Sequence, residues 1–367
     1  MRRFDADSCA GRGSGALLDL NPERILIIKP SSLGDIIHAL PTLAALRTRF
    51  PKAWIAWLVK QEWAEILEGH PCLNEVLAVN LDMAHWWNVV HAVRKRGFDL
   101  VVDLQGLFRS AFMAKLSGAP VIVGFAQGRE GSPWFYTHRV ALPIPAGQSW
   151  RLGSMHAVDR NLAVARFLGA ESGAPEFWLP SRDDDRQVVD QWLQACDVTD
   201  ADRLIAMAPL TRQSIKNWPL ERFVQLAHAL IRHDRVKVVL IGTEDQQVSS
   251  VFDSAVGSRF VNLMGKTRVR QLGIIFDRVQ LLIANDSAPL HIAAARGIPI
   301  VTIFGPTNPE ATGPYGMQGI HVLTRSLSCR PCGERTCWNE NKLECLTSIS
   351  VQDVVERAES ILRVVET

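Results

Sequence analysis

One segment, residues 24–41, constrains the fold most, and it reads Arg-Ile-Leu-Ile-Ile-Lys-Pro-Ser-Ser-Leu-Gly-Asp-Ile-Ile-His-Ala-Leu-Pro. Residues 25–28 are all apolar and mostly β-branched, which predicts a parallel strand covered on both faces. A turn rich in Pro, Ser and Gly follows, in which Ser32 can cap a helix whose apolar face begins at residues 36–40. The segment therefore predicts a strand, a turn and a helix at the carboxyl edge of a parallel sheet.

Asp35 stands in the first turn of this expected helix. A helix that begins at the edge of a parallel sheet binds anionic ligands, because its first N–H groups are unpaired and its N-terminus is partly positive. A carboxylate in that turn could simply stabilise the helix dipole. It could also act as a general base above a ligand-binding cleft. The spacing alone leaves both roles open and favours the first.

The run from Lys29 to Pro41 closely resembles the opening of the ADP-heptose:lipopolysaccharide heptosyltransferases, glycosyltransferase family 9. The resemblance implies that Asp35 is the catalytic base. It further implies that Ser32 and Gly34 contact the nucleotide-sugar donor, and that Lys29 contacts the acceptor.

The composition indicates a globular chain of more than one domain. At 367 residues the chain is long enough for two cores. Its net charge of only +2 argues against a nucleic-acid partner. No run approaches the roughly 18 apolar residues that a spanning helix needs. Residues 1–21 contain several glycines and no long apolar run, so we expect a flexible leader, no signal peptide and a cytoplasmic protein.

The seven cysteines fall into two groups. Cys9, Cys72 and Cys196 stand singly and predict inert thiols in a reducing compartment. The other four follow the pattern Cys-x2-Cys-x4-Cys-x7-Cys and are Cys329, Cys332, Cys337 and Cys345. The first spacing suits a metal, but the later ones match no standard zinc pattern, so a metal cluster and a redox-labile loop both stay open. We expect no metal and no cofactor in the reaction.

Strands and helices alternate through the first half of the chain, as in a β-α-β fold. The expected strands are 54–59, 75–79, 99–104 and 121–125, and the expected helices are 40–50, 84–96 and 156–168. A second polar corner follows the strand 99–104. From pattern alone Gln105 and Arg109 are a turn residue and a solvated helix residue. The resemblance implies that both contact the acceptor, whose carboxylates or phosphates an Arg can bind with two hydrogen bonds.

His156 and Arg160 lie four residues apart at the start of the expected helix 156–168. On pattern they are a surface pair. The family resemblance implies that both contact the acceptor.

A stretch rich in Pro, Ser, Arg and Asp at 174–185 is the best linker candidate. Beyond it the pattern of strand, polar loop and helix repeats, with a strand at 204–209 and a helix at 220–233. The loop between them carries Thr211 and Lys216, which could be ordinary loop residues. The resemblance implies that they contact the phosphate or the sugar of the donor, at a sheet edge where a diphosphate would sit.

Further polar corners follow the later strands of the second half, at about 236–242, 260–263 and 281–285. The resemblance implies donor contacts at these corners, to the ribose, the base and the sugar in turn. At the third corner Asp286 and Ser287 could equally cap the next helix, and Ala288 replaces a glycine that is commoner in the family. The implied donor residues are Gly242, Glu244, Met264, Asp286, Ser287 and His291.

The expected fold is α/β of the GT-B type, with two Rossmann-like, doubly wound parallel-sheet domains that face a central cleft. The expected parts are a leader at 1–21, an acceptor-binding domain at 22–178, a nucleotide-sugar-binding domain at 179–348 and a C-terminal helix at 349–367 that packs back across the domains.

The expected function is inverting transfer of heptose from ADP-heptose to a lipid-linked inner-core saccharide of lipopolysaccharide, by a monomer. Asp35 would deprotonate the acceptor hydroxyl, and Lys216 would meet the charge of the leaving diphosphate. A same-family transferase for another nucleotide sugar and a non-catalytic nucleotide-binding module remain alternatives. A dinucleotide oxidoreductase is disfavoured because no Gly-x-Gly-x-x-Gly follows a strand.

A lipid-linked acceptor requires access to a membrane surface. The adjacent Trp86 and Trp87 and the cations at 94–96 predict a weak peripheral contact with the cytoplasmic face of the inner membrane. Neighbouring residues cannot both face one side of a helix, so one of the two indoles is expected in the core. The basic cluster could equally be a solvated helix end.

Overall fold

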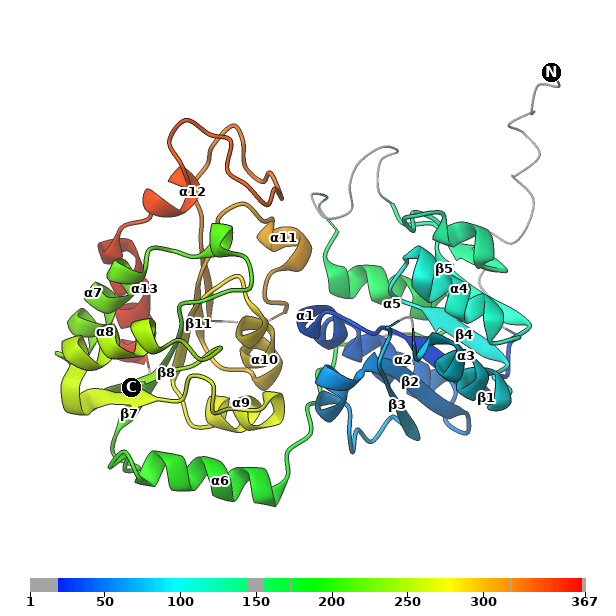
Figure 1. The fold of residues 1–367 in the computed structure, drawn as a ribbon, viewed down its shortest axis with the longest axis horizontal. Helices are drawn as coiled ribbons and strands as arrows, with labels where there is room; N and C mark the ends of the chain where they lie inside the picture. The colour runs from blue at the N-terminus through cyan, green and yellow to red at the C-terminus, as the bar shows by residue number, and fades with distance from the viewer. Residues whose placement is uncertain are drawn as a thin grey trace. The chain divides into compact units, whose positions relative to one another are not determined.

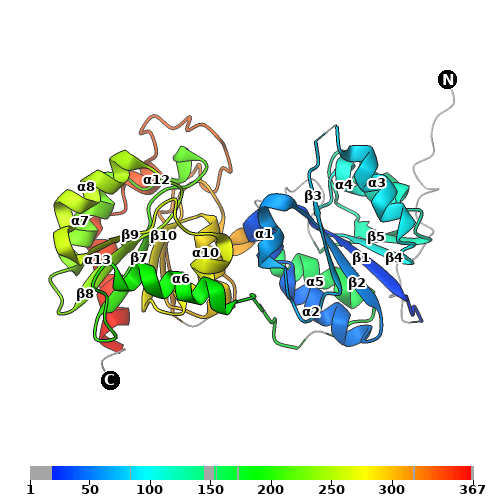
Figure 2. The same cartoon turned by 60° about the horizontal axis from the view of Figure 1, so that its bottom comes forward.

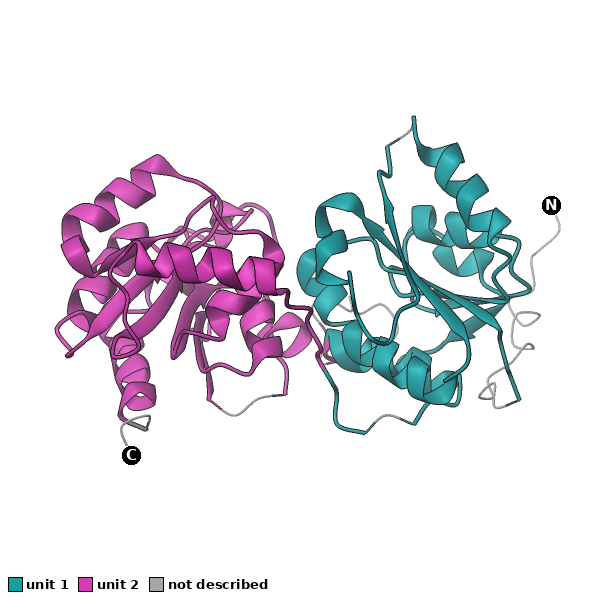
Figure 3. Cartoon of the chain, turned by 90° about the horizontal axis from the view of Figure 1, so that it is seen from below, with its two compact units in different colours: residues 1–144, 157–176 teal, residues 145–156, 177–367 magenta. Residues whose placement is uncertain are grey.

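The computed structural model describes residues 19–82, 84–143, 153, 155–171, 173–316 and 319–364. Most of the predicted leader and Cys9 lie outside this range. The chain divides into two compact units, coloured separately in Figure 3. Unit 1 comprises residues 1–144 and 157–176, and unit 2 comprises residues 145–156 and 177–367. Each unit contains one parallel sheet.

The sheet of unit 1 has six strands in the order β3-β2-β1-β4-β5-β6, and every pairing is parallel. Its strands are β1 (Arg24–Ile28), β2 (Trp54–Lys60), β3 (Glu75–Val79), β4 (Leu100–Asp103), β5 (Val121–Phe125) and β6 (His138–Val140). Its helical elements are α1 (Leu33–Ile37), α2 (Leu40–Arg49), η2 (Gln61–Ile66), α3 (Trp86–Lys95), α4 (Phe108–Leu116), η3 (Ser132–Phe135) and α5 (Ala157–Phe167).

Helices cover both faces of this sheet, as Figure 2 shows. Helices α2 and α5 pack against each other on one face, and α3 and α4 do so on the other. The central strand β1 is therefore covered on both sides, and residues 25–28 are at most 1% exposed. This burial is what its uninterrupted apolar sequence predicted.

The helix expected after Ser32 is divided into two. Helix α1 ends at Ile37, and α2 begins at Leu40 with Pro41 in its first turn. A proline there costs no hydrogen bond, because the first N–H groups of a helix are unpaired. The helix predicted at 40–50 is present as α2, but it does not continue the helix that begins after Ser32.

The sheet of unit 2 repeats the arrangement, with six parallel strands in the order β12-β11-β10-β7-β8-β9. Its strands are β7 (Arg203–Ala208), β8 (Val236–Leu240), β9 (Phe260–Asn262), β10 (Leu281–Asn285), β11 (Ile300–Ile303) and β12 (Ile320–Leu323). Its helical elements are α6 (Asp183–Gln194), η4 (Ser214–Lys216), α7 (Leu220–Leu230), α8 (Gln246–Val256), η5 (Gly257–Arg259), α9 (Val269–Phe276), α10 (Ala288–Arg296), α11 (Pro309–Thr312), α12 (Glu344–Thr347) and α13 (Val351–Val364). Figure 1 shows α7, α8 and α13 gathered beside one another in this unit.

The linker predicted at 174–185 extends too far. Residues 183–185 form the first turn of α6, where three carboxylates stabilise the helix N-terminus. Asp185 is 1% exposed and pairs with Arg270 and Arg268 at the start of α9. This acidic stretch belongs to the folded unit 2 because a buried carboxylate needs such partners.

The C-terminal helix α13 packs on α7, β10 and β11, all of unit 2. Its buried residues Val354, Ala358 and Ile361 recur at helical spacing and join the core of that unit. The expectation that this helix reaches across to the other domain stays a prediction. None of the helices described is long and apolar enough to cross a bilayer.

The two adjacent indoles of α3 have different surroundings, as their spacing predicted. Trp86 is partly buried against the core of unit 1, whereas Trp87 is 66% exposed. The three cations that follow, at 94–96, also differ in their surroundings: the first two are exposed, and the third is partly buried. Arg96 makes an ion pair with Glu75 at 2.6 Å, so it is fixed at the sheet edge.

Candidate active site

Both sheets bring the predicted site residues to the carboxyl ends of their strands. In a doubly wound sheet, ligands bind where the strand order reverses, because the loops from the two neighbouring strands there diverge to opposite faces. That point lies between β1 and β4 in unit 1 and between β7 and β10 in unit 2. The loops that follow these strands carry Asp35, Gln105, Lys216 and Asp286.

Asp35 is fixed by a capping box at the start of α1. Its Oδ2 accepts hydrogen bonds from the Ser32 N–H at 3.0 Å and from the Ser32 hydroxyl at 2.7 Å. The Ser32 N–H, which would otherwise lack a partner at the start of the helix, is paired in this way. Ser32, expected at the donor, thus positions the carboxylate within unit 1. Gly34 is buried in the same turn.

Two cations act on the Asp35 carboxylate. Burial alone would raise the pKa of Asp35, but Lys29, the hydrogen bonds from Ser32 and Arg160 together hold this pKa below its ordinary value. Burial lowers the pKa of Lys29, against the opposing effects of Asp35 and Asp103. Asp35 is therefore ionised at neutral pH and can accept a proton.

Asp103 organises the second corner of unit 1. This fully buried carboxylate accepts hydrogen bonds from the N–H groups of Gln105 and Gly106, at 2.9 and 3.2 Å. The hydroxyls of Ser110 and Tyr136 donate to its other oxygen, at 2.8 and 2.7 Å. Burial raises the pKa of Asp103 even though these hydrogen bonds oppose the effect. Asp103 was not among the predicted site residues, although its position at the end of a strand before a polar turn was a signal for it.

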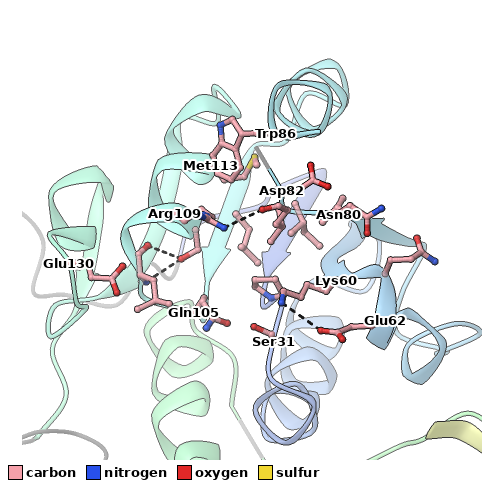
Figure 4. A pocket seen from close by; sticks show the side chains of 18 residues that line it. Ser31, Lys60, Glu62, Asn80, Asp82, Trp86, Gln105, Arg109, Met113 and Glu130 are labelled. Atoms are coloured by element: carbon pink, nitrogen blue, oxygen red, sulfur yellow. Dashed lines mark hydrogen bonds and ion pairs between the residues drawn. The ribbon is translucent and has the colours of Figure 1, made fainter. Parts of the chain in front are cut away.

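A pocket of about 750 Å³ opens in unit 1 beside this corner, as Figure 4 shows. Its walls come from the loops after β1, β2, β3 and β4, and Trp86 of α3 closes one side. The predicted residues Gln105 and Arg109 both line it, together with the ion pair of Lys60 and Glu62 at 3.6 Å. The Arg109 guanidinium donates to the carbonyl of Leu81 at 3.2 Å.

One side-chain atom of Gln105, a residue that lines this pocket, lacks a hydrogen-bond partner among the described residues. Its Oε1 is buried and has no hydrogen-bond partner within the described ranges. An unpaired buried acceptor is unfavourable, so a ligand hydroxyl that donates to it would restore the lost hydrogen bond.

Lys216 and Asp286 meet in unit 2. The Lys216 ammonium lies 2.7 Å from Asp286 Oδ2, and the Thr307 hydroxyl donates to the same oxygen at 2.8 Å. The Lys216 loop is held in turn by the fully buried Asn285, whose side chain donates to the carbonyl of Pro209 at 2.6 Å. An ammonium has three donors, so the ion pair leaves Lys216 able to bind an anion.

The other donor candidates occupy loops on the same sheet edge. Thr211 uses its hydroxyl within its own loop, where it donates to the carbonyl of Gln213 at 2.7 Å. Ser287 stands at the N-cap of α10, and its buried hydroxyl has no partner in the described part of the chain. His291 is buried one turn further along α10. Of the three, Ser287 has the most evident capacity to bind a ligand.

The loops that carry Glu244 and Met264 pack closely against each other through Gly265. The N–H of Gly265 donates to the carbonyl of Gly242 at 2.9 Å. A Cβ at Gly265 would lie 2.5 Å from the Cβ of Glu244, and its φ of +70° also favours glycine. The loops after β8 and β9 thus lie side by side, with Met264 buried and Glu244 exposed.

His156 and Arg160 are not a surface pair, because both are buried. His156 precedes α5 and belongs to unit 2, where its Nε2 lies 3.0 Å from the carbonyl oxygen of Gly313. Its ring also lies 4.7 Å from that of Tyr315. Arg160 belongs to unit 1 and acts on the charges of Lys29 and Asp35.

The four clustered cysteines line one pocket of about 220 Å³ in unit 2, and all are free thiols. Across the described ranges, no group of three or more His, Cys, Asp or Glu residues is arranged to hold a metal ion. The two single cysteines within those ranges, Cys72 and Cys196, are half-buried free thiols.

Comparison with known proteins identifies the class and then the family. Over 96% of its length the chain superposes on a glycosyltransferase of family 9 from Veillonella parvula, covering 99% of that chain with a TM-score of 0.80 and 24% identity. It also superposes on the E. coli ADP-heptose LPS heptosyltransferase II, over 94% of this chain and all of that one, with a TM-score of 0.74 and 22% identity. The fold is therefore that of the GT-B glycosyltransferases, which confirms the predicted class.

The sequence itself gives the family. Residues 86–343 match glycosyltransferase family 9 (heptosyltransferase). The chain is also 27% identical to lipopolysaccharide heptosyltransferase 1 of Pseudomonas aeruginosa, over 94% of this chain and 99% of the relative. The protein belongs to glycosyltransferase family 9 and is a glycosyltransferase.

Proposed function

We propose that this enzyme transfers heptose from ADP-heptose to a lipid-linked inner-core saccharide of lipopolysaccharide, with inversion at the anomeric carbon. The observation that carries the proposal is Asp35, a carboxylate kept ionised by Lys29 and Arg160 at the switch point of its sheet. A non-catalytic nucleotide-binding module has no need of such a base. The relatives from Pseudomonas aeruginosa and E. coli, both heptosyltransferases by name, support the choice of heptose and lipopolysaccharide.

In this proposal Asp35 removes the proton of the acceptor hydroxyl. Ser32 donates both of its hydrogen bonds to Oδ2, so Oδ1 is the oxygen that takes the proton. The acceptor oxygen forms its bond to the anomeric carbon as the bond from that carbon to the diphosphate breaks. Attack from the face opposite the leaving ADP inverts the configuration.

Unit 2 supplies the groups that bind the donor and stabilise the leaving diphosphate. Lys216 offers a cation, and Ser287 at the N-cap of α10 offers a hydroxyl that has no partner in the described part of the chain. Glu244 and Met264, on adjacent loops, are proposed to contact the nucleoside. Thr211 and His291 complete the proposed donor set.

Unit 1 is proposed to hold the acceptor in the pocket of Figure 4. Arg109 and Lys60 supply positive charge for the carboxylates or phosphates of an inner-core saccharide. Gln105 Oε1, which has no partner within the described residues, is proposed to accept a hydrogen bond from a sugar hydroxyl. Lys29 and Arg160 act mainly on Asp35 in this proposal.

We further propose a cytoplasmic monomer that touches the membrane through α3. The six described cysteines are all free thiols, which suits a reducing compartment. Trp87, His91 and Arg94 recur at helical spacing, so they share one exposed face of α3. Such a face combines an interfacial aromatic with a cation, and it would support weak contact with anionic lipid.

The test uses purified protein, a panel of ADP-sugars and other nucleotide sugars, and truncated lipopolysaccharide acceptors, with nucleotide release as the readout. We expect turnover with ADP-heptose, and a fall on the order of 100-fold or more in Asp35→Asn with ADP affinity unchanged. Asp234→Asn, at a carboxylate that is 92% exposed, is the matched control. Near-normal turnover by Asp35→Asn would remove this residue from the mechanism.

A further inference from the structure

Thr307 and Lys216 share one oxygen of Asp286. The Lys216 ammonium and the Thr307 hydroxyl lie 2.7 and 2.8 Å from Asp286 Oδ2. The Asp286 side chain is only 8% exposed, while that of Lys216 is 22% exposed. The carboxylate is thus largely removed from water, and its orientation depends on these two donors.

The three residues come from the ends of three adjacent strands. Lys216 follows β7, Asp286 follows β10, and Thr307 follows β11. The long side chain of Lys216 has many rotamers, and restricting it to one of them costs free energy. Because the Thr307 hydroxyl fixes the carboxylate, it also fixes where the ammonium of Lys216 can lie.

The loop that carries Thr307 is itself held from the cysteine-bearing segment. Arg330 donates to the carbonyl of Gly305 at 2.6 Å and to that of Thr307 at 3.2 Å. The N–H of Gly333 donates to the carbonyl of Pro306 at 2.8 Å. Gly305 also packs against Leu346, since a Cβ there would lie 2.8 Å from the side chain of Leu346. The position of Thr307 is therefore set by contacts outside its own loop.

We propose that Thr307 is a positioning residue of the donor site. It orients Asp286 and, through Asp286, aims Lys216 at the diphosphate, while Arg330 holds Thr307 in place. The inference rests on the proposed function of Lys216 in donor binding. Neither Thr307 nor Arg330 is proposed to touch the donor.

The test begins with Thr307→Val, which keeps the shape of the side chain and removes the hydroxyl. We expect the KM for the ADP-sugar and the Kd for ADP to rise roughly tenfold, as for loss of a hydrogen bond to a charged group, with the KM for the acceptor unchanged. Thr307→Ser keeps the hydroxyl and should restore both constants. A general loss of folded protein would lower kcat and leave the KM values alone.

Thr302→Val is the matched control. Thr302 lies on β11 in the same unit, is fully buried, and has a hydroxyl without a partner in the described part of the chain. Removing that hydroxyl should leave both donor constants as they are.

A double-mutant cycle separates positioning from a structural role. If Thr307 acts through Lys216, then Thr307→Val should add less than about twofold to the ADP Kd of Lys216→Met. Arg330→Met should change the donor constants in the same direction as Thr307→Val, and the pair should again be less than additive.

An unchanged ADP Kd in Thr307→Val, or full additivity with Lys216→Met, would overturn the proposal. ADP titration needs no turnover, so it still tests Thr307 if no sugar is transferred and the proposed reaction fails. A parent protein that does not bind ADP would overturn both.

Discussion

The Lys29 ammonium donates a hydrogen bond to the main-chain carbonyl of Leu104 at 2.9 Å, so the loop after β1 is tied to the end of β4. These two strands flank the switch point of the unit 1 sheet. Lys29 is only 5% exposed, and its charge acts on the Asp35 carboxylate. One buried cation thus joins the two corners of the unit and sets the protonation state of the proposed base.

Replacing Lys29 by Met should move the acidic limb of the pH profile of kcat/KM to higher pH. Lys29 lowers the pKa of Asp35, so its removal raises that pKa, and the base becomes protonated at a higher pH than in the parent. The measurement is kcat/KM between about pH 4 and pH 8. Lys52→Met, at an exposed lysine of unit 1, should leave the limb in place. Coincident limbs for parent and Lys29→Met would show that this charge does not set the pKa.

His70 should make unit 1 less stable as the solution is acidified. His70 is 4% exposed, and its Nδ1 accepts a hydrogen bond from the N–H of Cys72. Burial lowers the pKa of His70 from 6.5 to about 4, so below pH 6.5 the unfolded chain binds a proton that the folded chain does not. Stability is therefore lost as pH falls from about 6.5 to about 4, by roughly 2 kcal/mol at pH 5 relative to pH 7.

The measurement for His70 is the free energy of unfolding at pH 7 and pH 5 by denaturant titration. His70→Gln should reduce the difference between the two values, even if it destabilises the unit at both. His91→Gln, at an exposed histidine, should not reduce it. An equal pH dependence in parent and His70→Gln would contradict the assignment.

The sequence predicted the central strands well, because each is an apolar run between turn residues and is buried on both faces. Strands β6 and β12 were missed. Both lie at sheet edges, and β12 has no fully buried residue, so neither shows the pattern of a covered strand. Helix α6 was not predicted, because Asp183–Asp185 have the composition of a linker. Only the distant partner Arg270 shows why Asp185 is buried.

Candidate site residues could be named from the sequence where a polar corner follows an apolar strand. Asp35, Gln105 and Asp286 were candidates because they stand at such corners in a sequence that resembles family 9. The structure places all three beyond the carboxyl ends of parallel strands, and their roles stay predictions. Asp103 and Thr307 were not found. Their roles depend on contacts with Tyr136 and Asp286, which are 33 and 21 residues away in the sequence, and no local pattern encodes such pairs.

The cysteine cluster should react with alkylating agents in a defined order. A hydrogen bond from the N–H of Leu343 lowers the pKa of Cys337, whereas burial and the neighbouring thiols raise the pKa of Cys345. The thiolate is the reactive form, so Cys337 should react with iodoacetamide faster than Cys345 at neutral pH. Mass spectrometry of partly alkylated protein gives the rates. Protection of all four thiols, with about one equivalent of zinc or iron per chain, would instead establish a metal site.

The last prediction concerns the exposed face of α3 and its contact with anionic lipid. Arg94 and Lys95 are exposed near Trp87, whereas Arg96 is held by Glu75, so two cations and not three are available. Each cation near an anionic surface contributes about 1 kcal/mol, so changing Arg94 and Lys95 together to Gln should weaken vesicle binding at least roughly tenfold at low salt. High salt should abolish binding of the parent, because it screens these charges.

The matched control for α3 changes Lys52 and Arg166 to Gln, two exposed cations elsewhere on unit 1 that alter the net charge by the same amount. Co-sedimentation with vesicles that contain anionic lipid measures all three proteins. The control should sediment like the parent, because its lost cations lie on α5 and beside β2 and not on α3. Trp87→Ala should weaken binding at low salt as well, because an exposed indole favours the interface. If the α3 double variant sediments like the parent at low salt, the protein reaches its lipid-linked acceptor by another surface.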